Sequence, residues 1–167
     1  MMWGKKKING TVYDLTHLDP FILNVPRSGV LDDYRVLVEF GSHTFTEAFT
    51  PLHNRDLAIS DGKDLRAFCL KRHGYSQTLP AAIRAAVSGV ACFDHGRMLI
   101  SGALPGLAGP YLIAFKLRAK KTSRFDAVMT IVSAHHRPNL DPNLLCAPFK
   151  AAISATIQGR KIDWKKK

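Results

Sequence analysis

The chain has 167 residues, of which 46% are hydrophobic and 22% charged, and its formal net charge at pH 7 is +11. This length is typical of one domain that buries its own core, and the composition excludes a wholly disordered chain. No apolar run is long enough to span a bilayer and no apolar stretch follows the basic N-terminus, so we expect a cytoplasmic protein that does not enter the membrane.

Part of the positive charge lies at the two ends. Lysine runs at residues 5–7 and 165–167 supply six charges, which leaves +5 for the rest of the chain. We therefore expect a single domain over residues 1–167, with short basic tails at about 1–7 and 164–167. A basic body favours an anionic partner, and nucleic acid is the commonest, because Lys and Arg displace counterions from phosphates.

The first half of the chain predicts short strands. The β-branched and aromatic content favours strands at residues 8–15, 21–25 and 34–40, and we expect residues 43–50 to pair back on the third.

Two helices are predicted in the middle of the chain. Leu65, Phe68 and Cys69 recur at helical spacing, which indicates a helix over residues 64–73. A second helix over residues 79–88 has a proline in its first turn and is alanine-rich.

Strands return in the second half. A short hairpin is expected from residues 90–93 and 98–101, and a long hairpin from residues 111–120 and 125–136. The last of these strands is apolar on both faces, which predicts a central position. Residues 137–148 are interpreted as a connection, and residues 149–164 fit either a helix or a strand pair. The predicted fold class is α+β, an antiparallel β-sheet with two or three helices packed on one face.

The long hairpin carries a basic ribbon at its far end. This ribbon consists of Lys116, Arg118, Lys120, Lys121 and Arg124. A two-stranded basic ribbon can track a nucleic acid strand, which makes these residues the candidate RNA-binding set. The alternative is a solvated hairpin tip whose lysines prevent edge pairing.

The same hairpin ends in His135, His136 and Arg137, the candidate catalytic residues. Metal-free RNA cleavage needs a base, an acid and a cation on the phosphate, and histidine and arginine supply these groups. Adjacent strand residues point to opposite faces, so at most one of the two imidazoles belongs to a site. A symmetric hairpin places His135 about six residues, roughly 20 Å, from the level of Lys116, so the ribbon would hold neighbouring nucleotides. The alternative is that these are ordinary strand-end histidines.

Metal and cysteine chemistry have weaker signals. His43, His53, Cys69 and His73 form a zinc candidate set, but their spacing matches no standard zinc pattern. The three cysteines are odd in number and widely spaced, which argues against a disulfide scaffold and indicates a reducing compartment. No nucleotide-binding or hydrolase motif is present, so no cofactor is expected.

Two functions from different classes follow. The first is a nucleic-acid-directed, RNA-binding protein that extends to a metal-independent ribonuclease or toxin-like enzyme. The second is a non-catalytic module that binds nucleic acid or an acidic protein partner.

Overall fold

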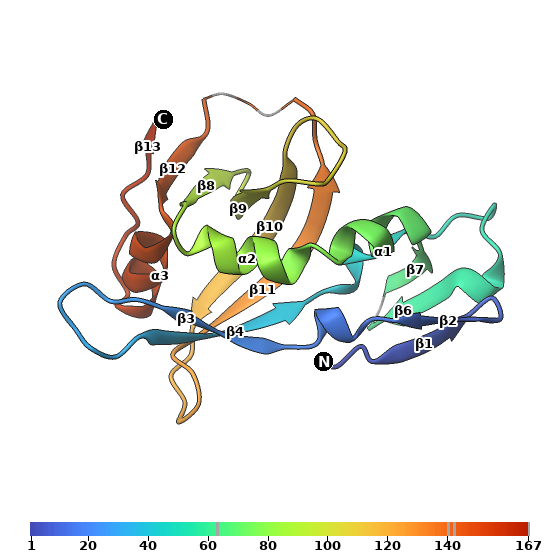
Figure 1. The fold of residues 1–167 in the computed structure, drawn as a ribbon, viewed down its shortest axis with the longest axis horizontal. Helices are drawn as coiled ribbons and strands as arrows, with labels where there is room; N and C mark the ends of the chain where they lie inside the picture. The colour runs from blue at the N-terminus through green and yellow to red at the C-terminus, as the bar shows by residue number, and fades with distance from the viewer. Residues whose placement is uncertain (63, 140, 142, 167) are drawn as a thin grey trace.

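A computed structural model describes the chain except for residues 63, 140, 142 and 167, so parts of the expected 137–148 connection and of the C-terminal tail lie outside the described residues. An eight-stranded sheet runs through the molecule in the order β13-β12-β8-β9-β10-β11-β4-β3 (Figure 1). Its strands are β3 (Phe21–Val25), β4 (Tyr34–Phe40), β8 (Val90–Asp94), β9 (Arg97–Gly102), β10 (Tyr111–Ala119), β11 (Ala127–His136), β12 (Leu145–Pro148) and β13 (Lys165–Lys166).

Two smaller sheets lie at the end of the molecule that also carries the first helix (Figure 1). One is the hairpin of β1 (Lys5–Ile8) and β2 (Thr11–Asp14), and the other has the order β5-β7-β6, with β5 (Thr46–Ala48), β6 (Ala58–Asp61) and β7 (Asp64–Phe68). The α-helices are α1 (Leu70–Ser76), α2 (Leu79–Ala86) and α3 (Phe149–Ile157), and the 3-10 turns are η1 (Thr16–Leu18), η2 (Ser42–Thr44) and η3 (Arg55–Leu57). The predicted α+β class, with sheet predominating, is confirmed.

The long hairpin β10–β11 forms the centre of the large sheet. Lys116 pairs with Thr130, but a bulge beyond Ala114 shifts the register, so that Leu112 pairs with His135. Strand β11 is central, as its apolar faces predict, because β4 pairs with its other edge. That pairing is parallel, so the sheet is mixed, whereas the sequence predicted an antiparallel one.

Alternate side chains of β10 enter two different apolar clusters. Ile113 and Phe115 belong to the main core, where Phe115 meets Phe149 of α3 with the ring centroids 6.2 Å apart. Ala114, on the opposite side of the strand, packs with Leu99 of β9 in a smaller cluster. Leu112, Lys116 and Arg118 share the side of the strand on which Ala114 lies.

Two predicted elements are wrong. Residues 64–68 form strand β7 rather than the start of a helix, because they pair with β5 and β6, and helix α1 begins only at Leu70. Residues 43–50 do not pair back on β4, since η2 turns the chain away and β5 pairs with β7 instead.

The cysteine count and spacing argued against a disulfide scaffold, but two of the three cysteines are paired. Cys92 of β8 and Cys146 of β12 are register partners and are joined by a disulfide bond, while Cys69 is free. This pair was not predicted because the segment that contains β12 has the pattern of a connection. Among the described residues, no helix has the length and hydropathy to cross a membrane.

Candidate functional site

Arg72 of α1 reaches the end of the central strand β11. Its guanidinium donates hydrogen bonds to Nδ1 of His135 at 2.5 Å, to the carbonyl of His43 at 3.1 Å and to the carbonyl of Thr46. Helix α1 starts directly after β7, and η2 lies against β11, so these elements bring Arg72 and His135 together from positions 63 residues apart.

A second arginine converges on the same segment. Nε of Arg66, on β7, donates to Oγ1 of Thr46 at 2.8 Å, and Thr46 Oγ1 in turn donates to the carbonyl of Ser42 at 2.8 Å. Thr46 is fully buried, so it fixes the position of the Arg66 guanidinium. Two guanidinium groups therefore lie around one buried threonine, held by neutral acceptors.

Burial and nearby arginines disfavour protonation of the two histidines in this cluster. Burial, followed by the charges of Arg72 and Arg137, lowers the pKa of His135 from 6.5 to about 4, so this imidazole is neutral near pH 7. Burial and the neighbouring Arg66 also lower the pKa of His43. Since Nδ1 of His135 accepts from Arg72, its proton lies on Nε2.

These arginines form no close ion pair among the described residues, although the carboxylates of Asp61, Asp64 and Glu47 act on Arg66 at longer range. Over the described ranges, ion pairs join His53 to Glu47, His95 to Asp94 and Lys165 to Asp163, and none involves an arginine. Positive charge without a carboxylate partner favours the binding of an anion.

His135 opens into a pocket of about 410 Å³, which we call the cationic pocket. Its lining residues come from the β8–β9 hairpin, from β10 and from the end of β11: Asp94, His95, Arg97, Leu99, Leu112, Ala114, Ser133, His135 and Arg137. The carboxylate of Asp94 contacts Nδ1 of His95 at 2.5 Å, so the pocket contains one carboxylate beside its two arginines.

His136 and Arg137 hold the loop that precedes β10. His136 Nε2 donates to the carbonyl of Ala108 at 2.7 Å, and the backbone N–H of Arg137 donates to the carbonyl of Pro110 at 2.9 Å. Gly109 has a φ of +86°, and a Cβ there would lie 2.6 Å from Cα of Pro138, so this close approach requires glycine. His136 thus has a structural contact, and of the two histidines only His135 lines the pocket, as the strand alternation predicts.

The basic ribbon is exposed along its whole length, and in the part of the chain that the structure describes none of its cations is ion-paired. Lys116 lies four residues along β10 from Leu112, the partner of His135, which corresponds to about 13 Å. The expected separation of roughly 20 Å is therefore too long, because the bulge and the register bring the ribbon closer to His135.

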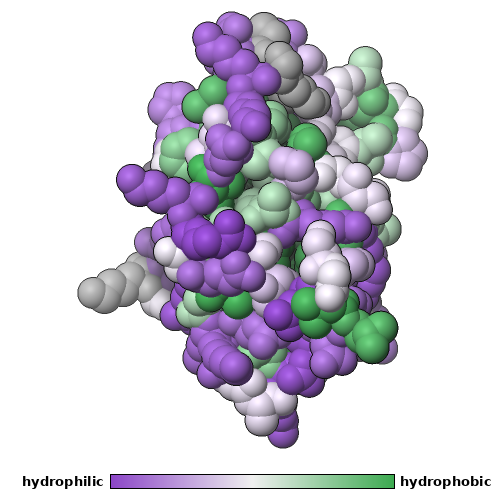
Figure 2. Space-filling view, turned by 90° about the vertical axis from the view of Figure 1, so that its left-hand side faces the viewer, coloured by the Kyte–Doolittle hydropathy of each residue, from purple (hydrophilic) through white to green (hydrophobic). Residues whose placement is uncertain are grey.

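Hydrophilic side chains also cover most of the side of the molecule that carries α3, with separate apolar patches among them (Figure 2).

The four residues of the zinc candidate set are not brought together. His53 contacts Glu47 and Thr50, whereas His73 contacts the carbonyl of Asp14 and the ring of His17. Throughout the described residues, no three His, Cys, Asp or Glu side chains are grouped to hold a metal ion.

Comparison with known proteins assigns the chain to a family. The family model described as the YjaZ family matches residues 5–157. The chain belongs to the YjaZ family. No curated protein and no solved structure matches it. The match spans β1 through α3 and so includes the cationic pocket and the basic ribbon of this YjaZ-family chain.

Of the catalytic candidates predicted from the sequence of this YjaZ-family chain, His135 and Arg137 line the pocket, whereas Arg66 and Arg72 were not predicted. Both arginines lie in the segment first interpreted as a helix and its end, where charged residues are ordinarily solvated. No local pattern marks them, because only the pairing of β7 and the position of η2 direct them toward β11.

Proposed function

We propose that this protein binds RNA, and that the cationic pocket holds a backbone phosphate. The observation that carries the proposal is that Arg97 and Arg137 line one pocket with neutral His135 and form no ion pair among the described residues. Arg72 and Arg137 both act on His135 electrostatically, and Arg72 also bonds to it. Inside the pocket, a phosphate oxygen can accept from the guanidinium groups of Arg97 and Arg137 and from the neutral imidazole N–H of His135.

The basic ribbon favours an extended polyanion over a small one. Lys116 and Arg118 continue along the same strand that borders the cationic pocket, and Lys120, Lys121 and Arg124 lie beyond them. Regularly spaced phosphates of a single strand fit such a track, because each contact releases counterions independently. An acidic protein segment is the competing partner, and it lacks the regular backbone charge that this arrangement suits.

The test is the salt dependence of affinity for a fluorescent single-stranded RNA, measured by anisotropy. Arg137→Gln removes an exposed cation of the pocket, and Arg55→Gln, an exposed arginine on η3, is the matched control. We expect the slope of log affinity against log salt concentration to fall by about 0.7 in the pocket variant and to stay unchanged in the control. Equal slopes in both variants, or displacement of the RNA by a polyglutamate peptide of equal charge, would contradict the proposal.

Metal-independent RNA cleavage is a second candidate function, because His135 and Arg137 line one pocket. A bound phosphate offsets the arginine charges and raises the pKa of His135. Once Arg72 turns from Nδ1 of His135 to the phosphate, the imidazolium can protonate the leaving oxygen, while water takes the proton of the attacking 2′-hydroxyl. His135→Ala should abolish turnover of RNA by the purified protein and leave binding largely intact. Cleavage at an unchanged rate in this variant would rule out the catalytic role of His135.

A further inference from the structure

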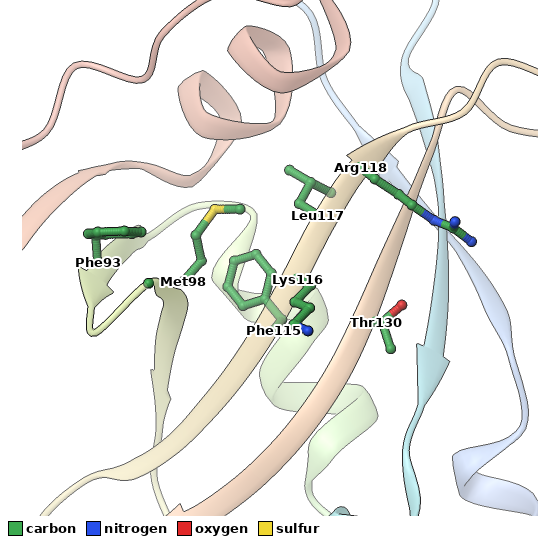
Figure 3. Close-up of a pocket in the computed structure, with 8 residues that line it drawn as sticks. Phe93, Met98, Phe115, Lys116, Leu117, Arg118 and Thr130 are labelled. Atoms are coloured by element: carbon green, nitrogen blue, oxygen red, sulfur yellow. The ribbon is translucent and has the colours of Figure 1, made fainter. Parts of the chain in front are cut away.

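A second cavity, of about 510 Å³, lies beside the basic ribbon (Figure 3). It forms because β9 is shorter than β10. Strand β9 pairs with β10 only as far as the Met98–Phe115 pair, whereas β10 continues to Ala119. From Lys116 onward, that edge of β10 has no strand partner among the residues described, and the cavity occupies the space next to it.

One wall of this cavity is apolar. Phe93, Met98, Phe115 and Leu117 lie on one side of β10 in Figure 3, with Phe93 and Met98 supplied by the β8–β9 hairpin. Phe93 is 39% exposed, which is unusual for a large aromatic side chain on a strand. Trp164, which does not line the cavity, packs against Phe93 with a centroid distance of 5.5 Å and supports its ring.

Two cations of the ribbon border the same cavity. Lys116 and Arg118 line it, and Figure 3 shows their side chains directed away from the apolar group that Phe115 and Leu117 join. An occupant must therefore be apolar and flat enough to lie beside Phe93, and must carry negative charge toward the adjacent strand face. An apolar peptide side chain meets the first condition but not the second.

We propose that this cavity binds an unstacked nucleobase of single-stranded RNA, with the adjoining phosphates on Lys116 and Arg118. The proposal rests on the RNA binding proposed above and adds the mode of recognition. A base stacked on an aromatic ring gains affinity with little dependence on sequence, because every base has a π-face. Duplex RNA keeps its bases stacked internally and cannot fill the cavity.

Phe93→Ala should weaken binding of single-stranded RNA by about 10-fold, the effect typical of losing one stacked base, and leave the salt slope unchanged. Phe93→Trp should keep the affinity of the natural protein. Leu107→Ala removes an equally exposed apolar side chain, also 39% exposed, from the loop before β10 and should have no effect. Anisotropy with the same oligonucleotide provides all four affinities.

A change in the RNA makes the test independent of folding. An oligonucleotide that carries abasic sites should bind the natural protein about 10-fold more weakly than the intact one and with the same salt slope. Equal affinity for intact and abasic RNA would overturn the nucleobase inference while leaving phosphate binding intact. Absence of any RNA binding by the natural protein would instead refute the proposed function itself.

Discussion

Acidification should destabilise this protein through His135. The unfolded chain binds a proton at this residue below about pH 6.5, whereas the folded chain does so only near pH 4, because burial and the charges of Arg72 and Arg137 disfavour the imidazolium. The folded pKa is lowered, so the stability contributed by neutral His135 is present above about pH 6.5. It is lost progressively as the pH falls toward 4.

The magnitude follows from the two pKa values. The difference between 6.5 and about 4 corresponds to about 3 kcal/mol, and screening by solvent at a half-buried side chain reduces this to about 1–2 kcal/mol. His135→Gln removes the titration and retains an acceptor for Arg72.

Urea denaturation of both proteins at about pH 7 and about pH 4.5 measures the effect. Between about pH 7 and about pH 4.5, the free energy of unfolding should fall by about 1–2 kcal/mol more in the natural protein than in the variant. The contributions of the carboxylates and of the other histidines are common to both proteins. An identical pH dependence would refute the assignment of His135 as a histidine held neutral by the arginine cluster.

Two further predictions concern the framework of the site. Gly109→Ala should lower the thermal unfolding midpoint more than Gly106→Ala does. Both glycines have positive φ, but only a Cβ at position 109 meets Pro138. Equal decreases in the midpoint would contradict that packing. Replacing Cys92 and Cys146 together by serine should lower the free energy of unfolding, measured by urea denaturation, by about 4 kcal/mol. This is the loop-closure value for a sequence separation of 54 residues. A reductant that leaves the unfolding midpoint of the natural protein unchanged would argue against the crosslink.

The parts of the fold that local sequence determines could be predicted. The hairpin β10–β11 follows from alternating β-branched and aromatic residues, and α2 follows from alanine content with Pro80 at its start. By contrast, β7 was mistaken for a helix because Leu65, Phe68 and Cys69 recur at helical spacing. Pairing with β5 and β6 makes the segment a strand, in which Phe68 is buried and Leu65 is exposed.

The residues of the candidate site also divide into those that a local pattern marks and those that only the fold brings together. His135 and Arg137 could be chosen as candidates because they lie at the end of a recognisable strand. Arg66 and Arg72 act on His135 only through contacts between distant segments. The separation between the ribbon and His135 was overestimated, since no sequence signal marks the bulge in the β10–β11 pairing. The disulfide was missed because β12 carries no clear strand pattern and ends at Pro148.

The binding of an RNA phosphate beside His135 is tested most directly by NMR titration of this imidazole in the free protein and in the presence of saturating single-stranded RNA. His135→Gln assigns the resonance. The phosphate would offset the charges of Arg72 and Arg137, so we predict that the pKa rises from about 4 by more than about one unit on binding. A pKa that stays near 4 while RNA is bound would contradict the account and place the phosphates elsewhere on the protein.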